Sequence, residues 1–170
     1  TATPIADIEA SVQRVYAACG MWPNALIVNR KVFRNLRMTA DVIDRLKYSG
    51  HQDPKADSIT PQAIAALLDL DEVIVAGESK NTVAEGGAAS LSDIWDDEYA
   101  MTAIIGKSAD VREPCVGRTI HWADDGSTLE GAVESYREEQ TRSQIIRVRQ
   151  QVDEVVHYVE AADLMDNITT

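Results

Sequence analysis

The stretch Pro-Asn-Ala-Leu-Ile-Val-Asn at residues 23–29 says more about the fold than any other part of the sequence. Its four consecutive apolar residues, 25–28, are typical of a buried strand. Asn29 is a favourable N-cap, so the pattern predicts a helix directly after the strand, over residues 30–37. A second apolar run at residues 72–76 predicts another buried strand.

Upstream of this stretch, residues 4–19 have the clearest helical pattern in the chain. Thr3 and Pro4 form a favourable N-cap and first helical position, and Gly20 is suited to a left-handed C-cap. The apolar residues between them recur at spacings of three and four, which predicts one buried helix face. These residues are Ile5, Ile8, Val12, Val15 and Cys19.

Downstream of it, the sequence predicts more helices first and mostly strands later. Helices are expected over residues 40–48 and 61–68, separated by a polar loop at 50–58. The Gly-, Ala- and Ser-rich residues 77–93 are expected to form an exposed, mobile loop. Further strands are expected at residues 99–105, 117–123, 132–137, 146–149, 152–159 and 164–168. This order of elements predicts an α+β fold.

Composition limits the classes of function. The chain has 170 residues, 45% of them hydrophobic, and a net charge of -12. Residues 71–170 carry eight Lys or Arg against twenty-one Asp or Glu, a surface that repels phosphate backbones, so we expect no sequence-specific binding of nucleic acid. No apolar run is long enough to predict a membrane helix. Cys19 and Cys115 lie far apart and outside any CxxC pair, so we expect no disulfide.

The first residues, Thr-Ala-Thr-Pro, contain no initiator methionine, basic segment or apolar segment. They do not have the features of a signal peptide. We therefore interpret Thr1 as an internal cut and expect further sequence upstream of it.

No motif for catalysis or cofactor binding is complete. Gly106-Lys107-Ser108 resembles the end of a phosphate-binding loop, but Met101 stands where such a loop needs glycine, so a surface turn is expected. His51, His121 and His157 lack the spacing of a zinc site. We expect no catalytic residue, no metal and no cofactor.

Two acidic clusters contain carboxylates of the kind that calcium and magnesium sites use. Asp96-Asp97-Glu98 and Asp124-Asp125-Gly126 lack the alternate ligand spacing of a calcium loop. The second of them is typical of a turn.

Four stretches, in this order and spacing, resemble the major capsid proteins of tailed bacteriophages. They are residues 20–36, with Pro-Asn-Ala-Leu-Ile-Val; 42–75, with Val-Ile-Asp-Arg-Leu-Lys-Tyr and a later Ile-Thr-Pro; 81–97, ending in Ile-Trp-Asp-Asp; and 136–168, with Tyr-Arg-Glu-Glu and Ser-Gln-Ile-Ile-Arg-Val-Arg. The resemblance extends over essentially the whole chain.

The resemblance implies a capsid fold without the N-terminal arm and extended loop of that family. Residues 1–22 would be the spine helix of a peripheral domain, and residues 23–128 an axial domain with a central mixed sheet. Residues 129–158 would be long strands of the peripheral domain, and residues 159–170 would return to the axial domain. The implied function is structural and not enzymatic: hexamers and pentamers of an icosahedral head that encloses DNA. Scaffold or portal proteins would be partners, and the location would be the virion, after assembly in the bacterial cytoplasm.

Subunit contacts are expected on the last long strands. Arg147 and Arg149 alternate with apolar residues and could face an acidic neighbour that presents Glu134 or Glu138. Two solvated arginines on an exposed strand are an equally good interpretation.

Three other functions are consistent with the sequence. They are the shell of a cellular nanocompartment with the same fold, a small adaptor domain that uses residues 77–93 as its contact, and an enzyme with a metal at Asp96 and Asp97.

Overall fold

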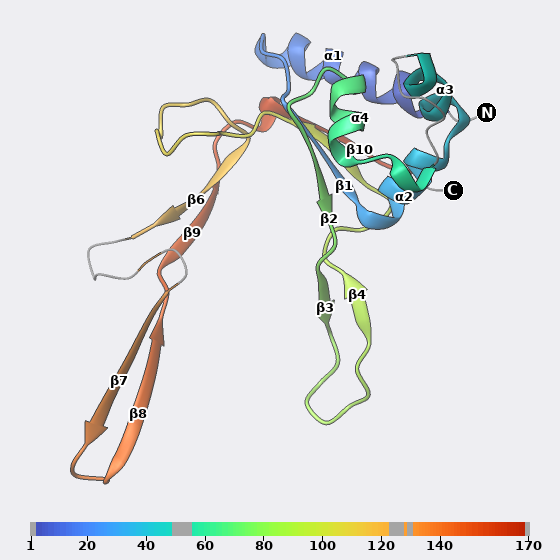
Figure 1. Cartoon of the computed structure of the whole chain (residues 1–170). Coiled ribbons are helices and arrows are strands. Elements are labelled where there is room, and N and C mark those ends of the chain that lie inside the picture. The colour runs from blue at the N-terminus through green and yellow to red at the C-terminus, as the bar shows by residue number, and fades with distance from the viewer. Residues whose placement is uncertain (1–2, 49–55, 123–127, 129–130, 169–170) are drawn as a thin grey trace. The chain divides into compact units, whose positions relative to one another are not determined.

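The structure is a computed structural model that describes residues 3–48, 56–122, 128 and 131–168 (Figure 1). The chain forms two compact units. We call residues 1–116 with 158–170 the α/β unit, and residues 117–157 the ribbon unit. Helices and strands are mixed, which is consistent with the predicted α+β class. The predicted loop at 50–58 lies largely outside the described residues, as do His51 and the turn at 124–127.

A four-stranded sheet with the order β10-β5-β1-β2 forms the centre of the α/β unit. Strand β1 (Ala25–Asn29) lies parallel to β2 (Glu72–Ala76) and antiparallel to β5 (Ala100–Ala103), which pairs in turn with β10 (Ala162–Met165). The strands predicted at 25–28 and 72–76 are therefore confirmed, and the structure shows that they are direct neighbours. The strand predicted at 99–105 is shorter than expected.

The predicted helices are also present. They are α1 (Pro4–Cys19), α2 (Arg30–Met38), α3 (Ala40–Tyr48) and α4 (Pro61–Leu67). Gly20 ends α1 in the left-handed conformation, with φ of 74°. The Asn29 side chain accepts a hydrogen bond from the Lys31 amide at 2.7 Å, and so caps α2 as predicted. Thr3 was expected to cap α1 in the same way, but its side chain makes no capping hydrogen bond.

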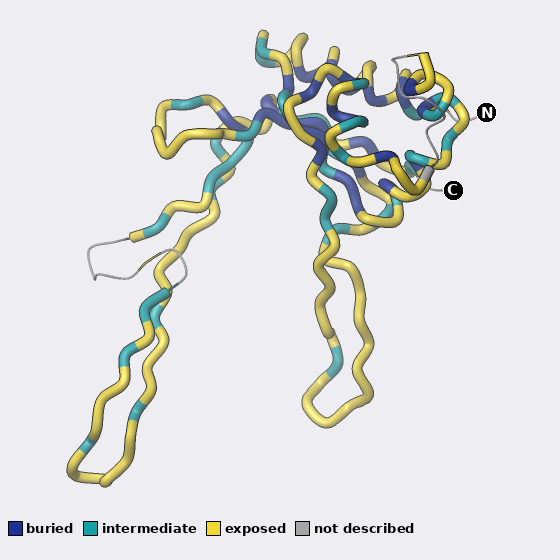
Figure 2. Tube along the Cα trace, viewed as in Figure 1, coloured by how far each residue is buried: buried dark blue, intermediate teal, exposed yellow. Residues whose placement is uncertain are grey.

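The hydrophobic core lies between the helices and one face of the sheet (Figure 2). Alternation along β1 points Leu26 and Val28 to that face, where Val73 lies opposite Leu26 on β2. Residues of α1, α2, α3 and α4 complete the same cluster, among them Ile8, Leu36, Leu46 and Ile64. The apolar stripe predicted for residues 4–19 is thus the core face of α1, although Cys19 is only half-buried.

Residues 77–93 are not a plain loop as predicted. Strands β3 (Ser79–Asn81) and β4 (Leu91–Asp93) pair as an antiparallel hairpin, all of whose paired residues are exposed. Their Gly, Ala and Ser content gives little strand propensity, so pairing was not expected. The Asn81 side chain helps to hold the two arms together, because it accepts hydrogen bonds from the amides of Val83 and Ser90.

The ribbon unit consists of two antiparallel strand pairs. Strand β6 (Gly117–His121) pairs with β9 (Val152–Val156), and β7 (Ala132–Glu138) pairs with β8 (Ser143–Arg149). All four strands were predicted, but β8 begins three residues before the expected 146. The predicted end at residue 159 is wrong, because residues 159–161 form a 3-10 helix. A short 3-10 helix also covers residues 56–58.

The final strand begins and ends earlier in the sequence than predicted. Strand β10 ends at Met165, whereas residues 164–168 were expected to be extended. Asn167 has a positive φ of 54°, which is incompatible with a continuing strand. Among the described helices, none combines the length and apolar character needed to span a membrane.

Candidate functional site

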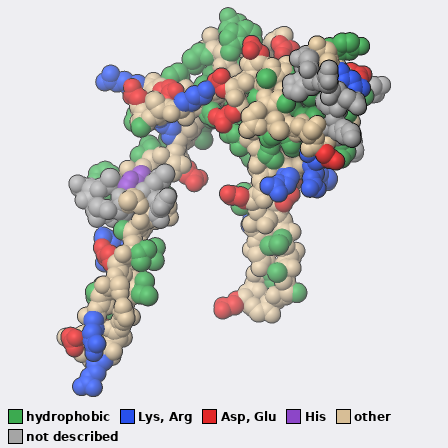
Figure 3. All heavy atoms as spheres, in the orientation of Figure 1, with side chains coloured by type: hydrophobic (Ala, Val, Ile, Leu, Met, Phe, Trp, Pro, Cys, Tyr) green, Lys and Arg blue, Asp and Glu red, His purple; other side chains and the backbone are tan. Residues whose placement is uncertain are grey.

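The β7–β8 hairpin exposes apolar side chains that do not pack into a hydrophobic core. Val133 and Val148 are direct cross-strand partners, and Ile146 is two residues from Val148 on the same face of the hairpin. Their exposed fractions are 72%, 69% and 69%. Hydrophobic side chains are visible along this hairpin, with basic side chains toward its turn (Figure 3). Contiguous exposed apolar residues of this kind mark interaction surfaces.

The four predicted subunit-contact residues all lie on this hairpin. Glu134 is the cross-strand partner of Arg147, and it also forms an ion pair with Arg149. Glu138 accepts a hydrogen bond from the Thr141 hydroxyl at 2.8 Å, and Arg147 is exposed. Arg149 and Glu134 are thus joined within one chain. Contact of these residues with a neighbour stays a prediction.

The described residues of the ribbon unit form no hydrophobic core of their own. None of its described residues is buried, in contrast to the α/β unit (Figure 2). A two-stranded ribbon is at best marginally stable in water, because each strand buries only one edge and no face. The unit therefore presents strand edges and side chains that a partner could cover.

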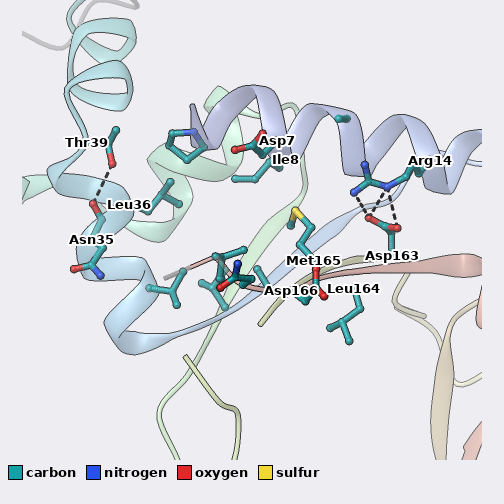
Figure 4. A pocket seen from close by; sticks show the side chains of 17 residues that line it. Asp7, Ile8, Arg14, Asn35, Leu36, Thr39, Asp163, Leu164, Met165 and Asp166 are labelled. Carbon is teal, nitrogen blue, oxygen red and sulfur yellow. Dashed lines mark hydrogen bonds and ion pairs between the residues drawn. The ribbon is translucent and has the colours of Figure 1, made fainter. Parts of the chain in front are cut away.

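A polar network that sequence reasoning missed joins α1 to β5 and β10. The Ser11 hydroxyl lies 2.6 Å from the Thr102 hydroxyl and donates to the Asp163 carboxylate at 2.5 Å. Arg14 donates to both oxygens of the same carboxylate, at 2.7 to 3.1 Å (Figure 4). Ser11 and Thr102 are fully buried, so these partners satisfy groups that would otherwise be costly to bury.

The Asp163 network borders a groove of about 720 Å³. Ile8 of α1, Leu36 of α2 and Met165 of β10 are among the residues that line it (Figure 4). The hydrogen bonds from Arg14 lower the pKa of Asp163 most, the bond from Ser11 lowers it further, and partial burial acts in the opposite direction. The arrangement holds α1 against β5 and β10.

Because the pKa of Asp163 is lowered by folding, its carboxylate should stabilise the fold above the unfolded-state pKa of about 3.9. That contribution should disappear as pH falls through the lower folded-state pKa. We expect Asp163→Asn to be less stable than the parent at pH 7, with a difference that shrinks below about pH 4. Urea unfolding of both proteins from pH 7 to pH 3 measures this, and a pH-independent difference would contradict it.

Residues 106–108 lie in a loop, and a carboxylate of the chain itself occupies the turn. The amides of Lys107 and Ser108 donate to Glu113 at 3.1 and 2.9 Å. The Lys107 ammonium donates to Asp71 at 2.7 Å, which raises the pKa of the lysine. The donors that a phosphate would need are therefore engaged within the chain.

The acidic residues 96–98 also have partners within the chain. Asp97 forms an ion pair with Lys31, and Asp96 accepts a hydrogen bond from the Glu98 amide. Across the described part of the chain, His, Cys, Asp and Glu form no group of three with the arrangement of a metal site. Cys19 and Cys115, both described in the structure, are not joined in a disulfide.

Comparison with known proteins gives a match among solved structures. No protein-family model matches the chain, and no curated protein matches it. Its fold is similar to that of a phage-related protein. The protein is from Bordetella bronchiseptica, with a TM-score of 0.76 and 25% identity over 98% of this chain. The match covers 52% of the Bordetella protein, so this chain spans about half of its length.

Proposed function

We propose that this chain forms the larger part of the major capsid protein of a tailed phage or prophage. In this proposal the protein assembles into hexamers and pentamers of an icosahedral head around DNA. Its location is the virion, after assembly in the bacterial cytoplasm, with scaffold and portal proteins as partners. The chain contributes structure, with no catalytic step and no cofactor.

The match to a phage-related protein supports a phage structural role, because it extends over 98% of this chain. The capsid assignment is supported by the four sequence stretches at residues 20–36, 42–75, 81–97 and 136–168. The same match favours a phage shell over a cellular nanocompartment.

The observation that best supports the proposal is the difference in side-chain burial between the two units. The α/β unit packs a continuous core, whereas no described residue of the ribbon unit is buried. A two-stranded ribbon without a hydrophobic core needs another surface to cover its exposed apolar side chains. In a shell, the neighbouring subunits provide that surface.

The experiment is a mass measurement by light scattering on the natural protein, including any sequence that flanks these 170 residues. Expression alone and together with the adjacent open reading frame covers the case in which a scaffold protein is needed. We expect masses of five or six subunits, or of complete shells. A monomer in every preparation would refute the proposal.

A further inference from the structure

The face of the four-stranded sheet opposite the helix-covered core is buried at Ala25, Ala103 and Asn29, which are 0%, 0% and 3% exposed, but it is exposed at Ile74 and Leu164. We call this the open face; its positions on the strands are Ala25, Ile27, Asn29, Glu72, Ile74, Ala76, Met101, Ala103, Ala162 and Leu164. They alternate with the positions that enter the helix-covered core. No large side chain of this face belongs to either hydrophobic cluster of the described chain.

Four large apolar side chains cross the middle of the open face in one row. Leu164 pairs with Met101, Met101 with Ile27, and Ile27 with Ile74, so the row runs over all four strands. Leu164 is 56% and Ile74 36% exposed, and the central two are half-buried. A sheet face that remains in water normally carries polar residues, so an unbroken apolar row indicates that something covers it.

The chain itself carries a surface of matching chemistry. One face of the β7–β8 hairpin consists of Val133, Ser135, Arg137, Gln144, Ile146 and Val148. Three of these are the exposed aliphatic residues described above, and the one charged residue is Arg137. The open face has Glu72 as its one charged position and no Lys or Arg. The two faces are therefore apolar at their centres, and their single charged residues have opposite sign; Arg137 also forms an ion pair with Glu139 of its own hairpin.

Net charge favours the same pairing. The α/β unit carries eleven Lys or Arg against twenty Asp or Glu, a charge of -9. Residues 132–149 carry four Arg against three Glu, a charge of +1. The whole ribbon unit carries five Arg against eight Asp or Glu, a charge of -3, so the attraction to an α/β unit is confined to the hairpin, whereas two α/β units repel each other.

We propose that a second copy of this chain covers the open face with the Val133, Ile146 and Val148 face of its β7–β8 hairpin. This inference rests on the proposed function and adds which two surfaces meet. Because the two surfaces differ, the contact is head-to-tail, and such contacts close into rings when the rotation between copies allows it.

Cross-linking between two tagged copies tests the contact in the natural protein. One copy carries Leu164→Cys and the other Val148→Cys, both with Cys19→Ser, and a short bismaleimide joins them; Cys115 is buried. We expect a cross-linked pair that contains both tags. The control replaces Leu164→Cys by Val111→Cys, a similarly exposed residue of the α/β unit, and should lose that product.

Charged substitutions provide an independent measurement. Leu164→Asp and Val148→Asp should each reduce assembly in light scattering, while Val111→Asp should not, and circular dichroism checks that all three fold. If rings form without a cross-link between the two differently tagged copies, and both Asp variants assemble normally, the inference is overturned. The proposed function would stand in that case. If the parent remains a monomer, the proposed function fails as well.

Discussion

Replacing Leu26 by alanine is expected to lower the free energy of unfolding of the α/β unit by about 3 kcal/mol. Leu26 is fully buried on β1, where it lies opposite Val73 of β2 and Thr102 of β5. Removing its side chain leaves a cavity in the continuous core, between elements that cannot collapse onto it because the sheet pairs on both sides. Urea unfolding followed by circular dichroism measures the change.

The adjacent residue provides the matched control. Ile27 lies on the same strand but on the open face, half-buried and outside the core cluster. Ile27→Ala should cost about 1 kcal/mol, because part of the side chain is already in water. Both variants are compared at a protein concentration low enough to prevent association. Equal losses for Leu26→Ala and Ile27→Ala would contradict the assignment of the two faces.

Replacing Asn29 by alanine is expected to cost about 2 kcal/mol, more than the loss of a helix cap alone. Asn29 is 3% exposed and caps α2 through the Lys31 amide. Its amide nitrogen also donates to the Asp93 carboxylate at 3.1 Å and to the Trp95 carbonyl at 2.5 Å, which ties the end of β4 to the sheet. Chemical unfolding gives the cost in free energy.

Thr60 is the comparison for that prediction. Its side chain caps α4 through the Ala63 amide at 3.3 Å and is exposed. Thr60→Ala should cost about 1 kcal/mol, which is the typical value of a cap alone. If Asn29→Ala costs no more than Thr60→Ala, the bonds to Asp93 and Trp95 contribute nothing to stability.

Local chemistry made much of the α/β unit predictable. Gly20, Asn29 and Thr60 mark helix ends through caps that depend on neighbouring residues alone. The uninterrupted apolar runs at 25–28 and 72–76 indicated buried strands, and both lie in the central sheet. The hairpin of β3 and β4 was missed, because its residues have little strand propensity; Asn81 hydrogen bonds between its arms accompany the backbone pairing.

The candidate site was only partly predictable, because it depends on strand register. The alternation of Arg147 and Arg149 with apolar residues was visible in the sequence and places them on an exposed strand. The pairing of Arg149 with Glu134 within one hairpin was not, since it requires the alignment of β7 with β8. Local sequence patterns could not predict the hydrogen bonds of Ser11, because Thr102 and Asp163 lie 91 and 152 residues away from it in the chain.

The most direct test of the central claim is negative-stain electron microscopy of the natural protein, expressed alone and with its adjacent open reading frame. The account predicts hexameric and pentameric rings or closed icosahedral shells. Small particles of single-chain size in both preparations would contradict it.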